Sequence, residues 1–403
     1  MGVPSRTILE KADLSPRVLL ICALLVIAAP VAAFAAPFIP TSDSQILERL
    51  PFTPSDPAIR DLRTLHSELG VSRGNLPLAL RVAQGYLALG RVTGDPRYAG
   101  YAEAALGPWW RLDQAPQEVL VVRATLRQRA HQFDAALADL AAVLKANPRN
   151  AQARLTRATI LQVQGAYEGA REECRALQDL TLELVWAACL ASVNAATGKL
   201  RESYWQLRAV LGRHANAPPG VKNWVLTSLA EMAVRAGMTQ EAEGHFRAAL
   251  ALNAADNYLL GAYADFQLDS DRASEVVGLL RDQTRADPLL LRYALALQAL
   301  HSTELPAQVE QLRDRFEASR LRGDRVHLRE EARFTLHLLI APAAALKLAQ
   351  ENWQIQKEPA DVRILLEAAL AAGDVAAVDS VTEWLSSSRL EDAKLQKILA
   401  PRG

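Results

Sequence analysis

Few residues of this chain have the types and spacing that catalysis requires. Its seven histidines are scattered, and none forms the His-Glu-x-x-His spacing that places two metal ligands on one helical face. They are His66, His131, His214, His245, His301, His327 and His337. A Gly-x-Ser-x-Gly elbow and a glycine-rich dinucleotide turn are also missing from the sequence. Gly198-Lys199 resembles the end of a phosphate-binding loop, but Val193 stands in place of the upstream glycine, which favours a structural turn. We therefore expect no enzyme, no metal site and no cofactor.

Two other stretches offer chemistry and a simpler alternative. Glu310–Arg333 carries seven arginines and six acids, which suits a phosphate or polyanion site. Because the two signs interleave, two solvated helices around Gly323-Asp324 are the favoured interpretation. Trp109-Trp110 could anchor a partner, but packing at the junction before the next helices is favoured.

An internal repeat reveals the elements that would position any site. Arg-Ala-Thr begins at Arg123 and again at Arg157, an offset of 34 residues, and an aromatic residue follows ten residues later in each copy. Repeats of this length usually indicate a solenoid of helix pairs. In the unit from Glu118 to Asn150, we predict a first helix that ends near Arg129. A turn at His131 and a second helix from about Asp134 to Ala146 follow, and Pro148 prevents the second helix from continuing.

Further units repeat the same signals. Small residues recur where two helices would cross, and a glycine recurs at the turn; the clearest examples are Ala124, Ala136, Ala158, Ala170, Ala230, Ala242, Gly165, Gly198 and Gly237. This pattern resembles the tetratricopeptide repeat over Glu118–Pro288. The resemblance implies an all-α, right-handed superhelix of stacked antiparallel helix pairs. Residues 58–117 read as N-terminal helices with a divergent repeat, and residues 289–403 as degenerate helical repeats with a C-terminal cap.

The resemblance also implies a concave groove lined by the first helix of each pair. The positions that it assigns to this groove are Gln128, Arg129, Thr159, Gln162, Ser192, Asn194, Trp224, Glu231, Arg235, Tyr258 and Asp265. Aromatic and arginine side chains of this kind often dominate the energy of an interface. Where some family members clamp a carboxylate with lysine and asparagine, this chain has Val121, Thr125, Leu155 and Thr159, so such a clamp is not expected.

By repeat position, Cys174 lies on a second helix and Cys189 on the first helix of the next unit. Neighbouring helices of such a stack touch there, so a disulfide is one interpretation. Two small buried thiols are the other.

The N-terminus predicts export from the cytoplasm. Positive residues up to Arg17 precede the uncharged apolar run Val18–Ala36, and Ala33-Phe34-Ala35 suits cleavage after Ala35. Residues 1–35 are thus predicted to be a signal peptide, with an uncleaved inner-membrane anchor as the alternative. A proline-rich extended leader is predicted over residues 36–57. In either case the repeats would lie outside the cytoplasm, in the periplasm or secreted.

Charge and repeats together suggest the function. The 403 residues contain 45 Lys and Arg against 45 Asp and Glu, which offers no broad attraction for nucleic acid or for a membrane surface. The chain is similar to exported bacterial repeat proteins that have no assigned activity. We expect a non-enzymatic scaffold that binds a peptide or helix of a protein partner in the groove. The alternative is an assembly factor for an exported polysaccharide or its synthase.

Overall fold

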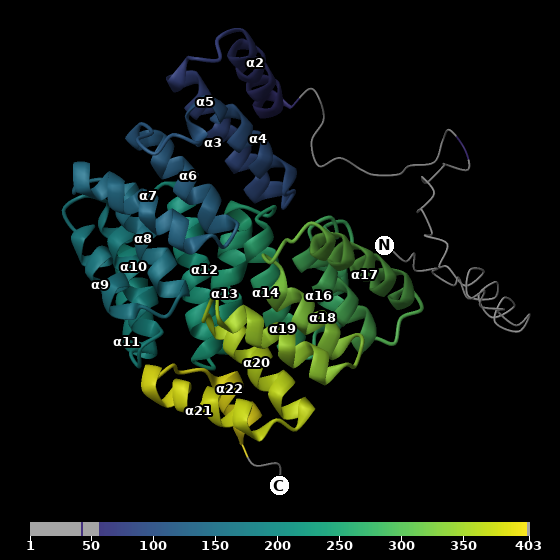
Figure 1. Cartoon of the computed structure of the whole chain (residues 1–403). Helices are drawn as coiled ribbons and strands as arrows, with labels where there is room; N and C mark the ends of the chain where they lie inside the picture. The colour runs from purple at the N-terminus through teal and green to yellow at the C-terminus, as the bar shows by residue number, and fades with distance from the viewer. Residues whose placement is uncertain (1–41, 43–55, 401–403) are drawn as a thin grey trace, which may run out of the picture. The chain divides into compact units, whose positions relative to one another are not determined.

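The computed structural model describes Ser42 and residues 56–400. In this part of the chain the secondary structure is entirely helical, with twenty-one helices, α2 to α22, that belong to one compact unit (Figure 1). Their bounds are α2 (Pro57–Val71), α3 (Leu76–Thr93), α4 (Arg97–Ala105), α5 (Gly107–Trp110), α6 (Gln117–Arg129), α7 (Phe133–Ala146), α8 (Ala151–Val163), α9 (Tyr167–Ala176), α10 (Glu183–Ala195), α11 (Leu200–Arg213), α12 (Pro219–Arg235), α13 (Thr239–Leu252), α14 (Asn257–Asp269), α15 (Ala273–Leu280), α16 (Asp287–Ala299), α17 (Leu305–Leu321), α18 (Leu328–His337), α19 (Pro342–Trp353), α20 (Pro359–Ala372), α21 (Val375–Ser388) and α22 (Ala393–Leu399).

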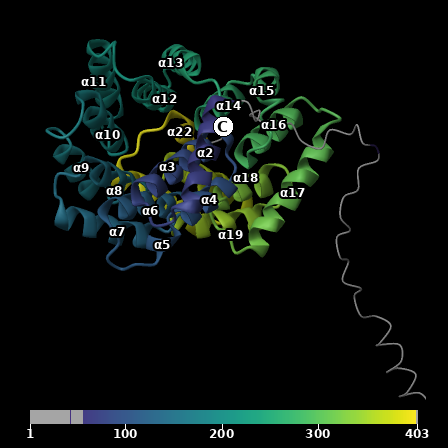
Figure 2. The same ribbon diagram turned by 90° about the horizontal axis from the view of Figure 1, so that it is seen from above.

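Most of these helices form antiparallel pairs. Nine pairs follow one another from α3/α4, through α6/α7 and its successors, to α20/α21. Viewed from above, second helices such as α11, α13 and α15 lie on the outer rim, and the first helices α10, α12 and α14 lie inside it (Figure 2). The predicted all-α fold of stacked helix pairs is confirmed, and the pairs continue through residues 289–400.

Small residues let the two helices of a pair approach closely. Ala124 and Ala136 are fully buried at the crossing of α6 and α7, and Ala230 and Ala242 at that of α12 and α13. The bulky side chain of Phe246 fills the space beside the latter crossing and is buried as well. Alternating small and large side chains pack such a core without voids, which stabilises each pair against its neighbours.

Each of the nine pairs turns through one residue with a positive φ. These residues are Gly94, His131, Gly165, Gly198, Gly237, Asp271, His301, Ile340 and Gly373. A left-handed residue ends a helix in one step, so the second helix can run back along the first. The predicted first turn is placed correctly, since α6 ends at Arg129 and α7 begins at Phe133.

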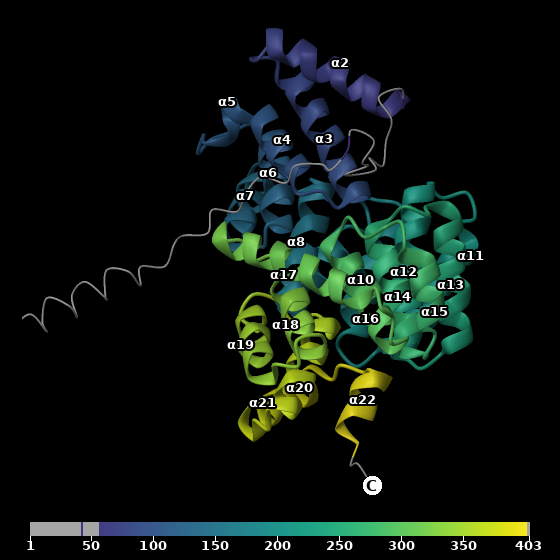
Figure 3. The ribbon, with the colours of Figure 1, turned by 90° about the vertical axis from the view of Figure 1, so that its right-hand side faces the viewer.

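The stack curls tightly enough for its successive superhelical turns to touch. Asp95, after the first pair's first helix, lies 3.0 Å from Arg285, which is 190 residues later. The amide of Lys357 donates to the carbonyl of Val163 (2.7 Å), and the amide of Leu200 donates to Glu391 (3.2 Å). The N-terminal helices therefore lie at one end of the stack and the C-terminal helices at the other (Figure 3).

The predicted signal peptide, its cleavage site at Ala35 and nearly all of the predicted leader lie outside the described residues. The leader was expected to extend to residue 57, but Pro57 is already the first residue of α2. None of the described helices has the length and apolar character needed to cross a membrane.

Candidate partner-binding groove

The predicted groove residues lie on the first helices of five consecutive pairs: α6, α8, α10, α12 and α14. They are best aligned on α12, where Trp224, Glu231 and Arg235 are spaced by seven and four residues. This spacing places three side chains in one stripe along a helix. Tyr258 and Asp265, spaced by seven, form the matching stripe on α14.

Glu231 and Tyr258 connect the two stripes. The Tyr258 hydroxyl donates to Oε1 of Glu231 across 2.6 Å. Tyr258 is nonetheless 62% exposed and Trp224 is 36% exposed, which makes them the large aromatic side chains that this surface offers to a partner. A tyrosine that is held by a hydrogen bond loses little entropy on binding, which favours tight contacts.

The electrostatics of this pair reflect crowded surroundings. Burial raises the pKa of Glu231 to about 7, against the lowering effect of the Tyr258 hydrogen bond. The charge of Glu231, which accepts the hydrogen bond from Tyr258, raises the pKa of Tyr258 well above its ordinary value. Arg329 and Glu358 from later helices also act on both groups.

Asp265 was predicted to line the groove for a partner, but the chain itself engages this carboxylate. Its two oxygens accept from Arg292 of α16 (2.5 Å) and from Arg333 of α18 (2.6 Å). Burial alone would raise the pKa of Asp265, but the two guanidinium groups lower it below its ordinary range. This residue therefore holds α14, α16 and α18 together, and its role in binding a partner stays a prediction.

Arg235 is engaged in a similar way. It donates to the backbone carbonyls of Ala195 (2.6 Å) and Glu391 (3.2 Å). One turn beyond Asp265, Asp269 accepts from Arg363 of α20 (2.6 and 2.8 Å) and from Lys394 of α22 (2.9 Å). The C-terminal helices therefore close part of the concave face that was expected to be open.

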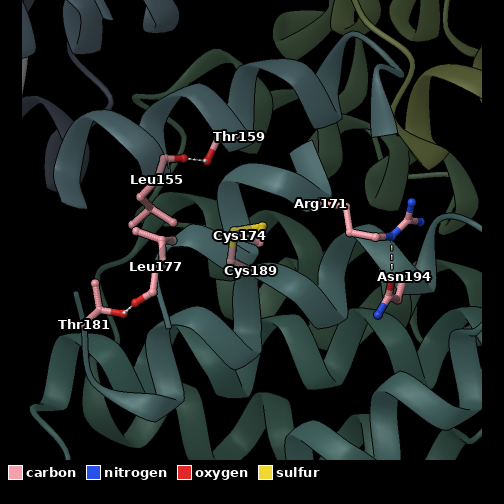
Figure 4. Close-up of a disulfide and its surroundings, with 8 residues drawn as sticks. All are labelled: Leu155, Thr159, Arg171, Cys174, Leu177, Thr181, Cys189 and Asn194. Atoms are coloured by element: carbon pink, nitrogen blue, oxygen red, sulfur yellow. Dashed lines mark hydrogen bonds between the residues drawn. A yellow bond between two sulfur atoms is a disulfide. The ribbon is translucent and has the colours of Figure 1, made fainter. Parts of the chain in front are cut away.

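The other six predicted lining residues differ in their surroundings. Arg129 reaches back to the Leu87 carbonyl of α3 (3.4 Å). Thr159 is exposed and donates within α8 to the Leu155 carbonyl (3.0 Å; Figure 4). Asn194 accepts from Arg171 (3.1 Å) on the second helix α9 (Figure 4). Gln128, Gln162 and Ser192 are half-buried.

Cys174 and Cys189 are joined by a disulfide, with their Cα atoms 5.5 Å apart (Figure 4). The bond connects α9 to α10, which are the second helix of one pair and the first helix of the next. Both residues are buried beside Ala158, Ala170 and Leu177. The bridge lies inside the stack and adds nothing to the exposed surface.

The arginine-rich stretch Glu310–Arg333 is engaged in internal pairs. Six of its arginines form ion pairs, as Arg315 does with Asp287 (2.8 Å) and Arg325 with Glu351 (3.2 Å). The seventh, Arg322, donates to Ser319 (3.1 Å). The expectation that both helices are solvated is wrong for α18, because Glu330 and Glu331 are buried.

Trp109 and Trp110 form the short helix α5 and pack against the N-terminal core, as the favoured interpretation held. A cavity of about 550 Å³ lies beside them, lined among others by Trp110, Arg123, Arg127 and Asp139. Asp139 pairs with both arginines at 2.7 Å. Among the described residues, no group of three or more His, Cys, Asp or Glu side chains is arranged to hold a metal ion.

Sequence reasoning missed the C-terminal side chains that meet the groove, above all Arg329, Arg333, Glu358 and Arg363. The signal that was available is their spacing, since Arg329 and Arg333 share one face of α18 with a gap of four residues. Arg333 pairs with Asp265 of α14, 68 residues earlier in the sequence, and the charge of Arg329 acts on Glu231 and Tyr258. Only the curvature of the stack brings these residues together.

Neither a protein-family model nor a curated protein matches this chain. Among solved structures, it is similar to yeast Tom70, with 11% identity and a TM-score of 0.41 over 85% of this chain and 83% of that chain. It is also similar to the TPR domain of P58(IPK), with 18% identity and a TM-score of 0.24 over 80% of this chain and 97% of that domain.

The chain's own architecture is more informative than these distant likenesses. Its pairs α6/α7 and α8/α9, which begin at Gln117 and Ala151, repeat at the 34-residue offset seen in the sequence, and each of the nine pairs turns through one left-handed residue. The described part of the chain is an all-helical stack of antiparallel helix pairs.

Proposed function

We propose that this protein is a non-enzymatic scaffold that binds a peptide or helix of a protein partner along its inner face, in the periplasm or envelope of a bacterium. One observation carries the proposal: Trp224 and Tyr258 are exposed on adjacent first helices, whereas the charged residues that flank them are engaged within the chain. Large aromatic side chains that are exposed beside a rigid framework are the usual anchors of an interface.

The surrounding contacts support a restricted binding surface. Arg235 and Asp265 bond to other parts of the chain, so they position the stack. Thr159, Trp224 and Tyr258 remain exposed. We therefore place the partner on α8, α12 and α14, with the two aromatic residues at the centre. The location outside the cytoplasm rests on the predicted export signal alone.

The test is affinity capture of the full chain, crosslinked in place in the bacterial envelope. The variant Trp224→Ala with Tyr258→Ala removes both anchors and leaves the ion pairs of α14 intact. We expect it to lose the captured partner, with binding weakened about tenfold or more. The matched control is Trp205→Ala, because Trp205 is 49% exposed on the second helix α11.

Each other outcome has a definite meaning. Equal capture by the native chain and the double variant would move the binding site away from α12 and α14. A captured ligand that resists protease but is lost by the double variant would instead support the polysaccharide-assembly role. Comparable circular dichroism melting curves would establish that each variant is folded.

A further inference from the structure

Contacts within the chain indicate which kind of segment packs against the turn between the two helices of a pair. The first-to-second-helix turns at Gly94 and Gly165 each lie against a loop between two later pairs, at Ala286 and Lys357. The turn at Gly198 lies against Arg389, in the segment between α21 and α22. A methyl group placed at Gly94 would lie 2.8 Å from Cβ of Ala286, and one at Gly198 would lie 3.0 Å from Cβ of Arg389. At this internal interface within the chain, the residues that join the two helices of an early pair therefore contact loops that follow later pairs.

A second set of turns is left uncovered by the described residues. The last residues of α16, α18 and α20 lie side by side, because Gln298 donates to the His337 carbonyl (2.7 Å) and His337 contacts Glu367 (3.0 Å). Their turns carry exposed apolar side chains: Leu300, Leu339, Ile340, Leu370 and Val375. We call this surface the turn edge. Ile340 is 70% exposed and Val375 is 69% exposed.

The other end of the stack offers the complementary element. The loops and loop borders before α6, α10 and α14 carry the exposed side chains of Leu112, Leu182 and Leu252. We call this surface the loop edge. Of the fifteen large apolar side chains that are exposed among the described residues, eight lie on these two edges. A gathering of this kind marks an interaction surface more often than isolated exposed residues do.

We propose that the turn edge docks onto the loop edge of a second copy of this chain, head to tail. The occupant follows from continuity with the internal interface, where turns are covered by inter-pair loops. Since the two edges are different surfaces of one molecule, the contact is heterologous, and it extends the stack by one copy at a time. This self-association uses neither Trp224 nor Tyr258, so it is independent of the proposed partner groove.

The first experiment is sedimentation velocity of the full chain over a range of concentrations. We expect species larger than the monomer to grow with concentration. The double variant Ile340→Lys with Val375→Lys places two charges on the turn edge and should weaken self-association about tenfold or more. The matched control is Val71→Lys, because Val71 is 88% exposed and lies on neither edge. Circular dichroism melting establishes that the variants are folded.

A mixing experiment tests the head-to-tail arrangement. A Leu112→Lys, Leu182→Lys variant blocks the loop edge and keeps the turn edge intact. Each blocked variant alone should be monomeric, and an equimolar mixture of the two should form a dimer and nothing larger. A monomeric native chain at all concentrations would overturn the proposal, as would self-association that the Ile340→Lys, Val375→Lys variant leaves unchanged. Binding of the monomer to lipid vesicles, lost in this variant, would overturn it in favour of a membrane surface.

Discussion

In the pair formed by Glu231 and Tyr258, the surroundings of the Glu231 carboxyl group disfavour its charged form. The carboxylate has one close hydrogen-bond donor in Tyr258, at 2.6 Å, and its surroundings remove much of its hydration. Asp265, seven residues after Tyr258, has two guanidinium partners and stays charged. Ionisation therefore carries a cost at Glu231 that paired residues on the same face avoid.

This difference predicts a pH dependence of stability. Burial raises the folded-state pKa of Glu231 from its ordinary 4.5 to about 7. Between these values the folded chain binds the proton more tightly than the unfolded chain, so this group's contribution to the free energy of unfolding falls as pH rises. Because glutamine stays neutral, the melting temperature of Glu231→Gln should rise relative to the native chain, by about one or two degrees between about pH 5 and pH 8.

The control for this prediction is Glu317→Gln, which changes an exposed carboxylate on α17. Its melting temperature should differ from that of the native chain by a constant amount across the same pH range. A constant difference for Glu231→Gln as well would show that this carboxylate titrates normally. Scanning calorimetry at several pH values provides the measurement.

At the scale of residues, the repeat pattern predicted a face of α12 and α14 but could not say which of its side chains bond within the chain. Trp224 and Tyr258 remain exposed, whereas Arg235 and Asp265 are bound by residues far along the chain. A repeat motif describes contacts between neighbouring units, and it carries no information about a carboxylate's partner 68 residues away. Asn194 accepts a hydrogen bond from Arg171 of the adjacent helix, a contact that the repeat pattern did not predict.

At the scale of elements, the turn of a helix pair can meet two separate requirements: a left-handed backbone, and room for a neighbouring segment of the chain. Gly94 and Gly373 both have a positive φ, of 67° and 69°. A methyl group at Gly94 would lie 2.7 Å from the Asn257 amide nitrogen and 2.8 Å from Cβ of Ala286, but one at Gly373 would meet nothing within 4 Å. Both turns require the left-handed conformation, and only the first also requires an empty space for the next superhelical turn.

The two glycines therefore predict different costs of an added methyl group. Gly373→Ala should lower the free energy of unfolding by about 1–2 kcal/mol, the cost of a left-handed alanine. Gly94→Ala should lower it by about 2–4 kcal/mol, because overpacking against Ala286 is added. Urea unfolding of both variants measures the difference. Equal losses of unfolding free energy in the two variants would mean that Ala286 and Asn257 move away from the added methyl group at Gly94 without destabilising the fold.

The disulfide joins elements that the repeat already packs together. Cys174 and Cys189 are separated by 15 residues, and a loop of about this length predicts a stabilisation of about 3 kcal/mol. Reductant should therefore shift the urea unfolding midpoint of the native chain downwards. The variant Cys174→Ala with Cys189→Ala should begin at the lower midpoint and show no further response. A native midpoint that is insensitive to reductant would contradict a stabilising bridge.

Element boundaries followed well from sequence because their signals are local. Small residues at helix crossings, turn glycines and Pro148 act within a few residues, which is the range that a pattern can describe. The turns at Asp271, His301 and Ile340 have no glycine, although each has a positive φ. After Pro288, the missing turn glycines at His301 and Ile340 came together with looser spacing, so the sequence showed only degenerate repeats there, where the structure has helix pairs.

At the scale of the whole molecule, the decisive property is curvature, which repeat motifs do not encode directly. Small rotations between pairs accumulate until Leu200 meets Glu391, 191 residues later. An open solenoid has only neighbour contacts, whereas this stack also has contacts between its superhelical turns. These contacts explain why the C-terminal helices lie against part of the predicted groove, and why the binding surface that we propose is smaller than the one that the repeat pattern predicted.

Contacts between superhelical turns should also change how the protein unfolds. Long arrays with only neighbour contacts lose cooperativity and unfold in parts. Here the Lys357 amide bonds to the Val163 carbonyl at 2.7 Å, so loss of the C-terminal pairs also exposes the turns of earlier pairs. We expect a single urea transition, with coincident midpoints by far-ultraviolet circular dichroism and by tryptophan fluorescence.

Disrupting the contacts between superhelical turns should replace the single urea transition by two separate transitions. Arginine at both Gly165 and Gly198 would collide with Lys357 and Arg389, which lie within 3.3 and 3.0 Å of the added Cβ atoms. The Gly165→Arg, Gly198→Arg variant should therefore give separated midpoints by the two probes. The control, Gly323→Arg with Gly373→Arg, has the same left-handed backbone cost and no neighbour within 4 Å. It should keep one transition at lower urea, since its superhelical turns still touch; two transitions in the control would show that cooperativity depends on turn conformation alone.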